Sequence, residues 1–421
     1  MVAATPPGTP LFETWREPLS TPSRFRRARF DTISAKEGHR VLLLGCGAVG
    51  TVAAVHLAAS RTVDEVVAAD MDIGRAKGLV NAVGSRKVRP LRLDLSDEDA
   101  LRRALRGTSL VINAALPKFN LSIMAAALEA GIDYMDLAGG GKSQLALDAK
   151  WRHEGRTALL GMGEDPGFAN VFARHGANAM DEVDAVKIRD GETARSEEHP
   201  FICLFSPEVF IEETLEPATV YKDGKWKKVP PFSGREEYPF PPPVGPVPVY
   251  DVNHEEVETI PRFLGKRPRF VDFKLALLPD TVQTLQLIGR LGLMKRGKAG
   301  RPGTREALLA KIPPPGSLAG KITGHAAILV EVTGWRDGLE VNHTIWAAMD
   351  HVRAARRHTT TGTAWITGTG AGVGALLMLD HEVPQGGVFV PEQLDPSSVF
   401  ARLKGRDIHV KERITEVRQL T

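Results

Sequence analysis

The residues best suited to chemistry form a glycine-rich turn between an apolar run and a helical pattern. They match the spacing G-x-G-x-x-G with Gly45, Cys46, Gly47, Ala48, Val49 and Gly50. The first glycine permits a tight turn, the second lets backbone N–H groups approach a pyrophosphate, and the third lets helix and strand pack closely. Because the turn follows a strand and opens a helix, the pattern predicts dinucleotide binding rather than a purely structural turn.

Asp70 identifies the dinucleotide that this turn would favour. It ends the next strand-like run, about twenty residues after Gly50, where a carboxylate can accept hydrogen bonds from the adenine-ribose hydroxyls. The same carboxylate repels a 2′-phosphate, so NAD is the predicted cofactor. Arg75, on the following helix, keeps NADP open as an alternative.

A second group of residues follows the ends of later strand-like runs, where parallel sheets bind their ligands. Candidate cofactor contacts there are Asn113, Ala114 and Ala115, with Asn120 as a candidate substrate contact. In the same loop, Lys118 suits a substrate contact or a proton carrier, although an exposed loop lysine is the commoner explanation.

Asp165 begins the sequence Asp165-Pro166-Gly167 after another such run. It suits a catalytic carboxylate beside a bound substrate, because the start of the next helix could bind the carboxylate of that substrate. It suits equally well a turn that caps this helix. The sequence leaves both interpretations open.

A third group lies between Asn253 and Arg262. If this segment is a strand, His254, Glu256 and Glu258 share one face. A histidine beside a carboxylate has the components of a general base tuned near neutral pH, and an arginine can hold a carboxylate in bidentate fashion. The alternative is an ordinary exposed, acidic strand.

Composition excludes several other kinds of chemistry. The 421 residues carry a formal net charge of +3 with no concentrated basic face, so nucleic-acid binding is not expected. Cys46 and Cys203 are the two cysteines, and the twelve histidines show no H-E-x-x-H pattern, so no metal site is predicted. Low cysteine content and the lack of a long uninterrupted apolar stretch predict a cytoplasmic protein without a membrane segment.

The elements that position these residues fall into two classes. Between residues 39 and 165, continuous apolar strands alternate with helices, which predicts a doubly wound parallel sheet of the Rossmann type. Residues 166–361 contain hairpin-like pairs, above all His325 to Gly334 with Leu339 to Ala347, which predict a second α+β domain with a mixed sheet. Residues 1–38 form a proline-rich arm, and residues 362–421 begin with a small-residue helix typical of close packing.

Several later motifs resemble those of the saccharopine dehydrogenase family. The resemblance rests on the stretches 113–120, 131–139, 163–167, 204–206, 216–218, 245–262 and 387–392. Their order covers about residues 39–415, and the later stretches look most like lysine 6-dehydrogenase-type members. The resemblance implies a Rossmann domain, a substrate-bearing mixed-sheet domain and a C-terminal segment, 362–421, that returns to the first domain.

The family reaction implies hydride transfer at a carbon that bears nitrogen, in an amino acid or opine-like conjugate. Lysine oxidation is the first substrate expectation, and saccharopine dehydrogenation is the second. The matching family segment lines the substrate pocket, which favours His254 as general base, Arg262 as carboxylate anchor and Glu256 as a substrate contact; Asp165 and Lys118 complete the catalytic candidates. Relatives often self-associate, so the expected partners are a small amino-acid-type substrate and a second copy of the chain. An enoyl reductase and a non-catalytic dinucleotide-binding scaffold stay open as alternatives.

Overall fold

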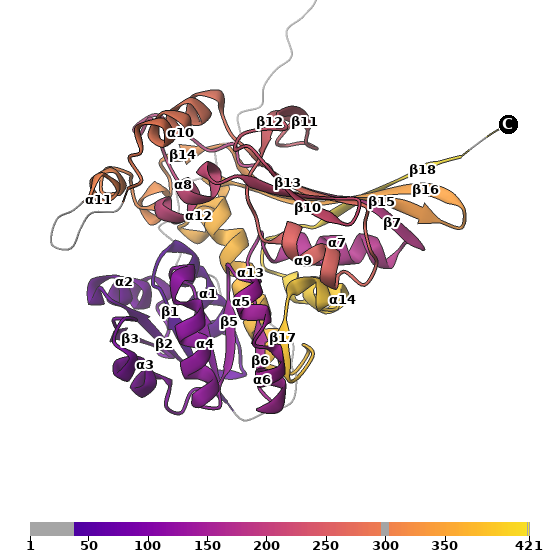
Figure 1. Ribbon diagram of the computed structural model, residues 1–421. Coiled ribbons are helices and arrows are strands. Elements are labelled where there is room, and N and C mark those ends of the chain that lie inside the picture. The colour runs from indigo at the N-terminus through magenta and orange to yellow at the C-terminus, as the bar shows by residue number, and fades with distance from the viewer. Residues whose placement is uncertain (1–37, 296–302, 419, 421) are drawn as a thin grey trace, which may run out of the picture.

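The computed structural model describes residues 38–295, 303–418 and 420. The arm predicted for residues 1–38 therefore lies almost wholly outside the described residues. Two sheets organise the rest, and Figure 1 shows them as two bodies joined by a long helix, α13 (Gly362–Leu379).

The first sheet is parallel throughout and has the order β17-β6-β5-β4-β1-β2-β3. Its strands are β1 (His39–Leu44), β2 (Val63–Asp70), β3 (Val88–Arg92), β4 (Leu110–Asn113), β5 (Asp133–Asp136), β6 (Thr157–Leu159) and β17 (Gly387–Phe389). The helices between them are α1 (Ala48–Ala59), α2 (Ile73–Val83), α3 (Glu98–Leu105), α4 (Asn120–Glu129), α5 (Lys142–Leu145) and α6 (Asp148–His153), with a 3-10 turn, η1, at Pro117–Phe119. Buried apolar strands such as β1 and β4 account for helices on both faces. The predicted doubly wound fold is confirmed.

The second sheet has nine strands, and its main path runs β10-β9-β13-β7-β15-β16-β18. These are β7 (Glu182–Asp190), β9 (Ala218–Lys222), β10 (Lys225–Val229), β13 (Phe270–Ala276), β15 (His325–Arg336), β16 (Leu339–Asp350) and β18 (Lys411–Val417), and β11 (Glu236–Pro239) and β12 (Pro246–Asp251) pair beside β13. Only β7 and β13 run parallel within this sheet, as far as its described strands show. The expected mixed sheet and the hairpin of β15 with β16 are both present.

The remaining elements border the second sheet or link it to the first. They are α7 (Phe168–Asn178), α8 (Pro207–Leu215), α9 (Glu256–Phe263), α10 (Pro279–Leu291), α11 (Thr304–Leu309), α12 (His351–His358), α14 (Pro396–Leu403), the 3-10 turns η2 (Pro315–Leu318) and η3 (Pro391–Gln393), and the short pair β8 (Arg195–Ser196) and β14 (Ile322–Thr323).

The C-terminal part of the chain returns to both sheets. α13 packs along α1, and its glycines permit the approach, because a Cβ on Gly368 would lie 2.5 Å from Cβ of Val52. β17 then extends the parallel sheet, whereas β18 pairs with the outer edge of β16. The predicted return to the first domain thus holds for α13 and β17 but not for β18. Although α13 is long and apolar enough to cross a membrane, 89% of its apolar window is buried, so it is a core helix.

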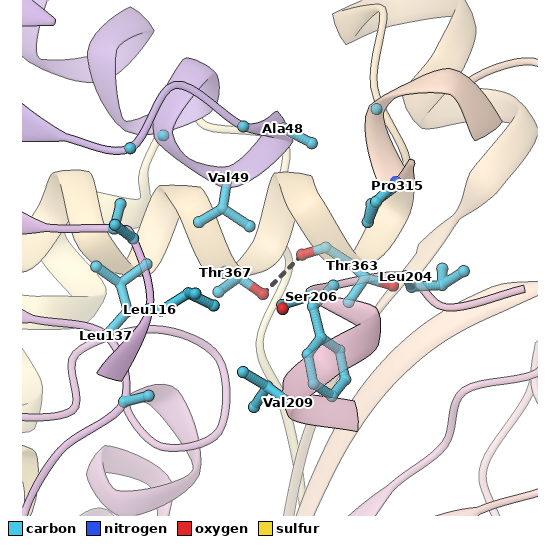
Figure 2. Close-up of a pocket in the computed structure, with 18 of the residues that line it drawn as sticks. Ala48, Val49, Leu116, Leu137, Leu204, Ser206, Val209, Pro315, Thr363 and Thr367 are labelled. Carbon is cyan, nitrogen blue, oxygen red and sulfur yellow. Dashed lines mark hydrogen bonds between the residues drawn. The ribbon is translucent and has the colours of Figure 1, made fainter. Parts of the chain in front are cut away.

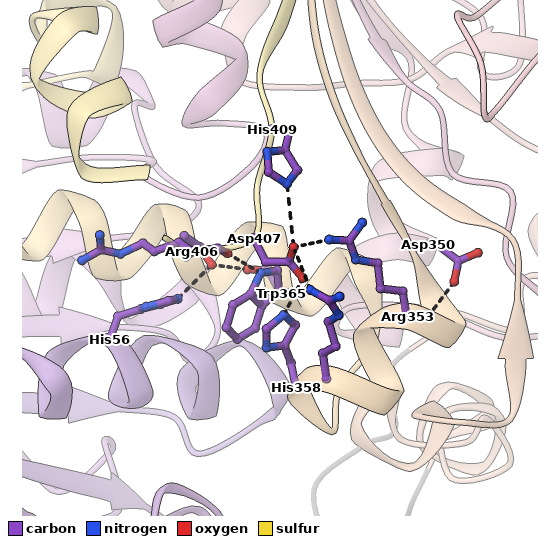
Figure 3. Close-up of polar contacts among 10 residues, drawn as sticks. His56, Asp350, Arg353, His358, Trp365, Arg406, Asp407 and His409 are labelled. Atoms are coloured by element: carbon purple, nitrogen blue, oxygen red, sulfur yellow. Dashed lines mark hydrogen bonds and ion pairs between the residues drawn. The ribbon is translucent and has the colours of Figure 1, made fainter. Parts of the chain in front are cut away.

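Aromatic and polar contacts hold α13 against α1, and we call this contact region the seam (Figure 3). Nε2 of His56 lies 2.9 Å from Oγ1 of Thr369, and the Trp365 ring stacks on His358 with centroids 3.5 Å apart. The Trp365 indole N–H donates to the carbonyl of Arg406, and His358 contacts the carboxylate of Asp407 at 3.1 Å. The seam therefore fixes α13 relative to the glycine-rich turn that opens α1.

Candidate active site

One cavity of about 1170 Å³ runs from the glycine-rich turn to the second sheet. This volume exceeds that of an ordinary ligand pocket, so it has room for a dinucleotide together with a substrate. Figure 2 shows Ala48 and Val49 on one side of it, with Ser206 and Pro315 from the second domain opposite. Thr363, at the start of α13, closes a further part of the wall.

The glycine-rich turn has the geometry that a dinucleotide needs. Gly45 has a φ of +96°, and a Cβ there would lie 2.5 Å from the Ala114 carbonyl oxygen. At Gly47 a Cβ would meet nothing within 4 Å, so the backbone is open to the cavity, whereas at Gly50 it would lie 2.1 Å from the Gly45 carbonyl oxygen. The three glycines therefore serve the turn, the open phosphate side and the close packing respectively.

Asp70 lies at the far end of this turn and lines the cavity. Its carboxylate accepts the backbone N–H of Cys46 and of Asp72, each at 3.0 Å, which fixes its direction. Burial, followed by the charge of Asp70, raises the pKa of the Cys46 thiol to about 12, so the cysteine is a packed thiol and not a reactive thiolate. Arg75 also lines the cavity beside these residues.

Asn113 and Asn120 line the cavity but use most of their polar groups to hold its wall. The amide of Asn113 donates to Oδ1 of Asn120 at 2.6 Å and accepts the N–H of Ala115 at 3.0 Å. Asn120 in turn donates to the Ala138 carbonyl at 2.8 Å. Ala114 and Ala115 thereby present their backbone to the cofactor side of the cavity.

His254 reaches the same cavity from the second domain. Its Nδ1 lies 2.5 Å from Oε2 of Glu256, whose side chain is fully buried, and its ring stacks on Phe273 with centroids 3.9 Å apart. Among the described residues these contacts engage Nδ1 and leave Nε2 without a hydrogen bond. Burial alone would lower the pKa of His254, but the carboxyl groups of Glu256, Glu255 and Asp165 raise it well above the usual value.

The segment after His254 is a helix and not the expected strand. Val257, Ile260 and Leu264 recur every three or four residues and are all buried, so the helical period prevails over the short polar alternation. His254 and Glu256 still meet, but through the turn that starts α9. Glu256 is consequently placed behind His254, away from the position of a direct substrate contact that the sequence suggested.

Asp165 lies in the turn before α7 and does not itself cap that helix. Its turn leads into α7, where the Gly167 N–H is accepted by Oδ1 of Asn170 at 2.9 Å, and its side chain lines the cavity. Burial and the nearby Asp190 and Glu164 raise the pKa of Asp165 well above the usual range. A hydrogen bond links the carboxyl groups of Asp165 and Asp190.

Three further carboxyl groups line the cavity and were not among the sequence candidates: Asp190, Glu213 and Glu255. Burial is the first cause that raises the pKa of Asp190 to about 7 and that of Glu213 to about 8. Asp190 ends a strand that has a parallel neighbour, as Asp70 does, and that signal could have found it. Glu213 lies mid-helix in α8, where the sequence gives no corresponding signal.

Lys118 and Arg262 do not line the cavity. Lys118 is exposed, with its ammonium 5.2 Å from the centre of the Phe119 ring. Arg262 pairs with Glu258 at 2.9 Å and lies over the Trp226 ring at 4.6 Å. On a helix, the i, i+4 spacing turns Arg262 toward Glu258 on the outer face.

Comparisons with known proteins match both halves of the chain. A model of the saccharopine dehydrogenase NADP binding domain matches residues 41–159, and one of the saccharopine dehydrogenase C-terminal domain matches residues 163–408, more than half of the chain. The fold also resembles that of apo saccharopine dehydrogenase (L-Glu forming) from Saccharomyces cerevisiae. The TM-score is 0.66 at 16% identity, with 90% of this chain and 100% of that one covered.

Two similar relatives have names that refer to carboxylated amine conjugates. Carboxyaminopropylagmatine dehydrogenase from Synechocystis sp. is 29% identical over 86% of this chain and 95% of its own length. Carboxynorspermidine synthase from Vibrio alginolyticus is 28% identical over 88% of this chain and 97% of its own length.

Proposed function

The chain belongs to the saccharopine dehydrogenase family of NAD(P)-binding oxidoreductases, and from that premise we propose that it transfers hydride at the C–N bond of a carboxylated amine conjugate. One observation carries the proposal: a single cavity is lined by both the dinucleotide-type glycine turn and His254, which Glu256 contacts from behind. A bound nicotinamide would supply the hydride chemistry, and the glycine turn, Asp70 and the loop at Asn113 would hold the dinucleotide.

In the oxidative direction, the substrate nitrogen must first lose a proton, because an ammonium has no lone pair to form a C=N bond. Nε2 of His254, when neutral, takes that proton, and Glu256 stabilises the imidazolium through Nδ1. The neutral amine could then form an iminium by giving hydride from the neighbouring carbon to a bound nicotinamide, which would accept both electrons. In the reductive direction, the imidazolium returns the proton to the product amine.

Phe273 and Glu256 restrict how His254 can move. Stacking fixes the ring plane at 9° to Phe273, and the hydrogen bond fixes the ring rotation, so Nε2 has one direction available. We assign Asp165 to the same catalytic group, since it lines the cavity and carries a proton that it shares with Asp190. The proposal gives no role to Lys118 or Arg262.

The relatives favour a conjugate over free lysine, which was the first substrate expected from the sequence. Both relatives are named for a polyamine-like compound that carries an added carboxyl group. For the cofactor, we propose NAD over NADP because the Asp70 carboxylate is fixed at the cavity wall and would repel a 2′-phosphate.

Absorbance at 340 nm tests the proposal directly. Purified protein is mixed with NAD or NADP and, in turn, carboxynorspermidine, carboxyaminopropylagmatine, saccharopine or lysine. We expect NADH formation with a carboxylated conjugate, a lower KM for NAD than for NADP, and little turnover of lysine. Absence of turnover with every amine, together with tight cofactor binding, would contradict the proposal and favour a non-catalytic scaffold. Reduction of an enoyl substrate instead would place the chain with the enoyl reductases.

A further inference from the structure

We propose that Glu213 binds a second positive charge of the substrate, separate from the reacting nitrogen, and thereby selects conjugates that end in an ammonium or guanidinium group. This inference rests on the proposed function and assigns the specificity of the same site.

Carboxyl groups outnumber basic side chains around His254. The side chains that line this end of the cavity include Asp165, Asp190, Glu213 and Glu255, and Glu256 lies directly behind. Two other basic side chains line the described cavity, but Arg75 lies beside Asp72 near the glycine turn and His358 is bonded to Asp407. One imidazole therefore faces five carboxyl groups, and a cationic ligand would allow more of them to ionise.

Glu213 differs from its neighbours on α8 in having no partner. Glu208 and Glu212 both pair with Arg305, the latter at 2.7 Å. Within the described part of the chain, Glu213 makes no hydrogen bond or ion pair, although it lines the cavity and is largely enclosed by protein. A carboxyl group in such a position is costly unless it is protonated or meets a cation.

The groups that face Glu213 explain how a cation would act. Burial, followed by the charges of Glu255, Glu256 and Glu216, raises the pKa of Glu213 to about 8, and the positive charge of His254 opposes this rise. With no cation beside it, Glu213 is mostly protonated at neutral pH. A bound ammonium lowers that pKa, so binding releases a proton and leaves an ion pair in its place.

Substrate discrimination is the first test. Values of kcat/KM are compared for a conjugate that ends in a primary amine and for its analogue with a methyl group in place of that amine. Glu213→Gln should lower kcat/KM for the amine about tenfold to a hundredfold, mainly through KM, and leave the methyl analogue nearly unchanged. Glu212→Gln, one residue away but outside the cavity, is the matched control and should keep the discrimination.

An equal loss with both substrates would overturn the inference, as would wild-type discrimination in Glu213→Gln. These outcomes differ from failure of the proposed function, in which the wild-type protein turns over neither substrate. Lost discrimination after treatment with EDTA would also overturn it, because the cation would then be a metal ion held at His254, Glu255 and Glu256, whose ligand atoms lie within 4.8 Å of one another.

Proton release is the second test and does not depend on turnover. Calorimetric titration of the amine conjugate at pH 7.5, in two buffers of different ionisation enthalpy, should show protons released from the wild-type protein. Glu213→Gln should release measurably fewer. The same release from both proteins would contradict the assignment.

Discussion

His56 and His254 are both enclosed by protein, yet their surroundings drive them to opposite charge states. Burial and the nearby cations of Arg406 and His358 lower the pKa of His56 to about 3. At His254 burial acts in the same direction, but the carboxyl groups of Glu256, Glu255 and Asp165 reverse it. The difference teaches that neighbouring charge, not burial, decides which buried histidine can carry a proton at neutral pH.

The two histidines also serve different parts of the molecule. His56 lies at the seam of α1 and α13, with its ring 5.2 Å from that of Trp365, and contributes to packing. His254 lies at the cavity with one ring nitrogen free. One region therefore packs α13 beside the glycine-rich turn, and the other is the one for which we propose acid–base chemistry.

The largest effect is expected from His254→Gln. Glutamine keeps a polar side chain but cannot exchange a proton at neutral pH, so kcat should fall by about 10²–10⁴-fold. Steady-state rates of NADH formation measure the change, with cofactor affinity as the control for folding. A fall of less than threefold would show that another group transfers the proton.

A smaller effect is expected from Glu256→Gln, which removes a charge but not the side chain's bulk. Loss of this charged hydrogen bond should lower kcat by about tenfold to a hundredfold. Because Glu256 raises the pKa of His254, the variant should also shift the ascending limb of the oxidative pH profile to lower pH. A purely structural role would lower activity without moving that limb.

The smallest effect on catalysis is expected from His56→Gln at the seam. Loss of the ring contact should lower the free energy of unfolding by about 1–3 kcal/mol while kcat stays within twofold of wild type. Denaturant unfolding monitored by circular dichroism measures the first quantity. A large fall in kcat would show that the seam controls the chemistry.

The same variant should change how stability depends on pH. The folded pKa of His56 is depressed below its ordinary value of 6.5, so the unfolded chain binds more protons between about pH 3 and 6.5. The stability that neutral His56 contributes is fully present above about pH 6.5. It falls by about 1.4 kcal/mol per pH unit as the pH drops through this window. The difference between wild type and His56→Gln should therefore shrink on acidification.

The parallel sheet and its glycine turn could be predicted from the sequence because local signals agree there. β1 and β4 are buried apolar runs, and the three glycines have the spacing that the backbone geometry of the turn requires. Asp70 follows from its place at a strand end. Such features depend on neighbours close in the chain, so one sequence suffices.

The acid–base site could be predicted only in part because it depends on tertiary packing. His254 and Asp165 were identified by type, but the direction of Arg262 follows from α9 being a helix, which buried Val257 and Ile260 decide. Glu213 and Glu212 are adjacent glutamates, and only the packing of α8 separates the cavity residue from the partner of Arg305.

A crystal structure with NAD and a carboxylated amine conjugate would test the central claim most directly, that one cavity joins the cofactor turn to His254. We predict the pyrophosphate over Gly47, and the reacting nitrogen within hydrogen-bonding distance of Nε2 of His254. A nicotinamide that lies outside the cavity, or a conjugate bound away from His254, would contradict the account.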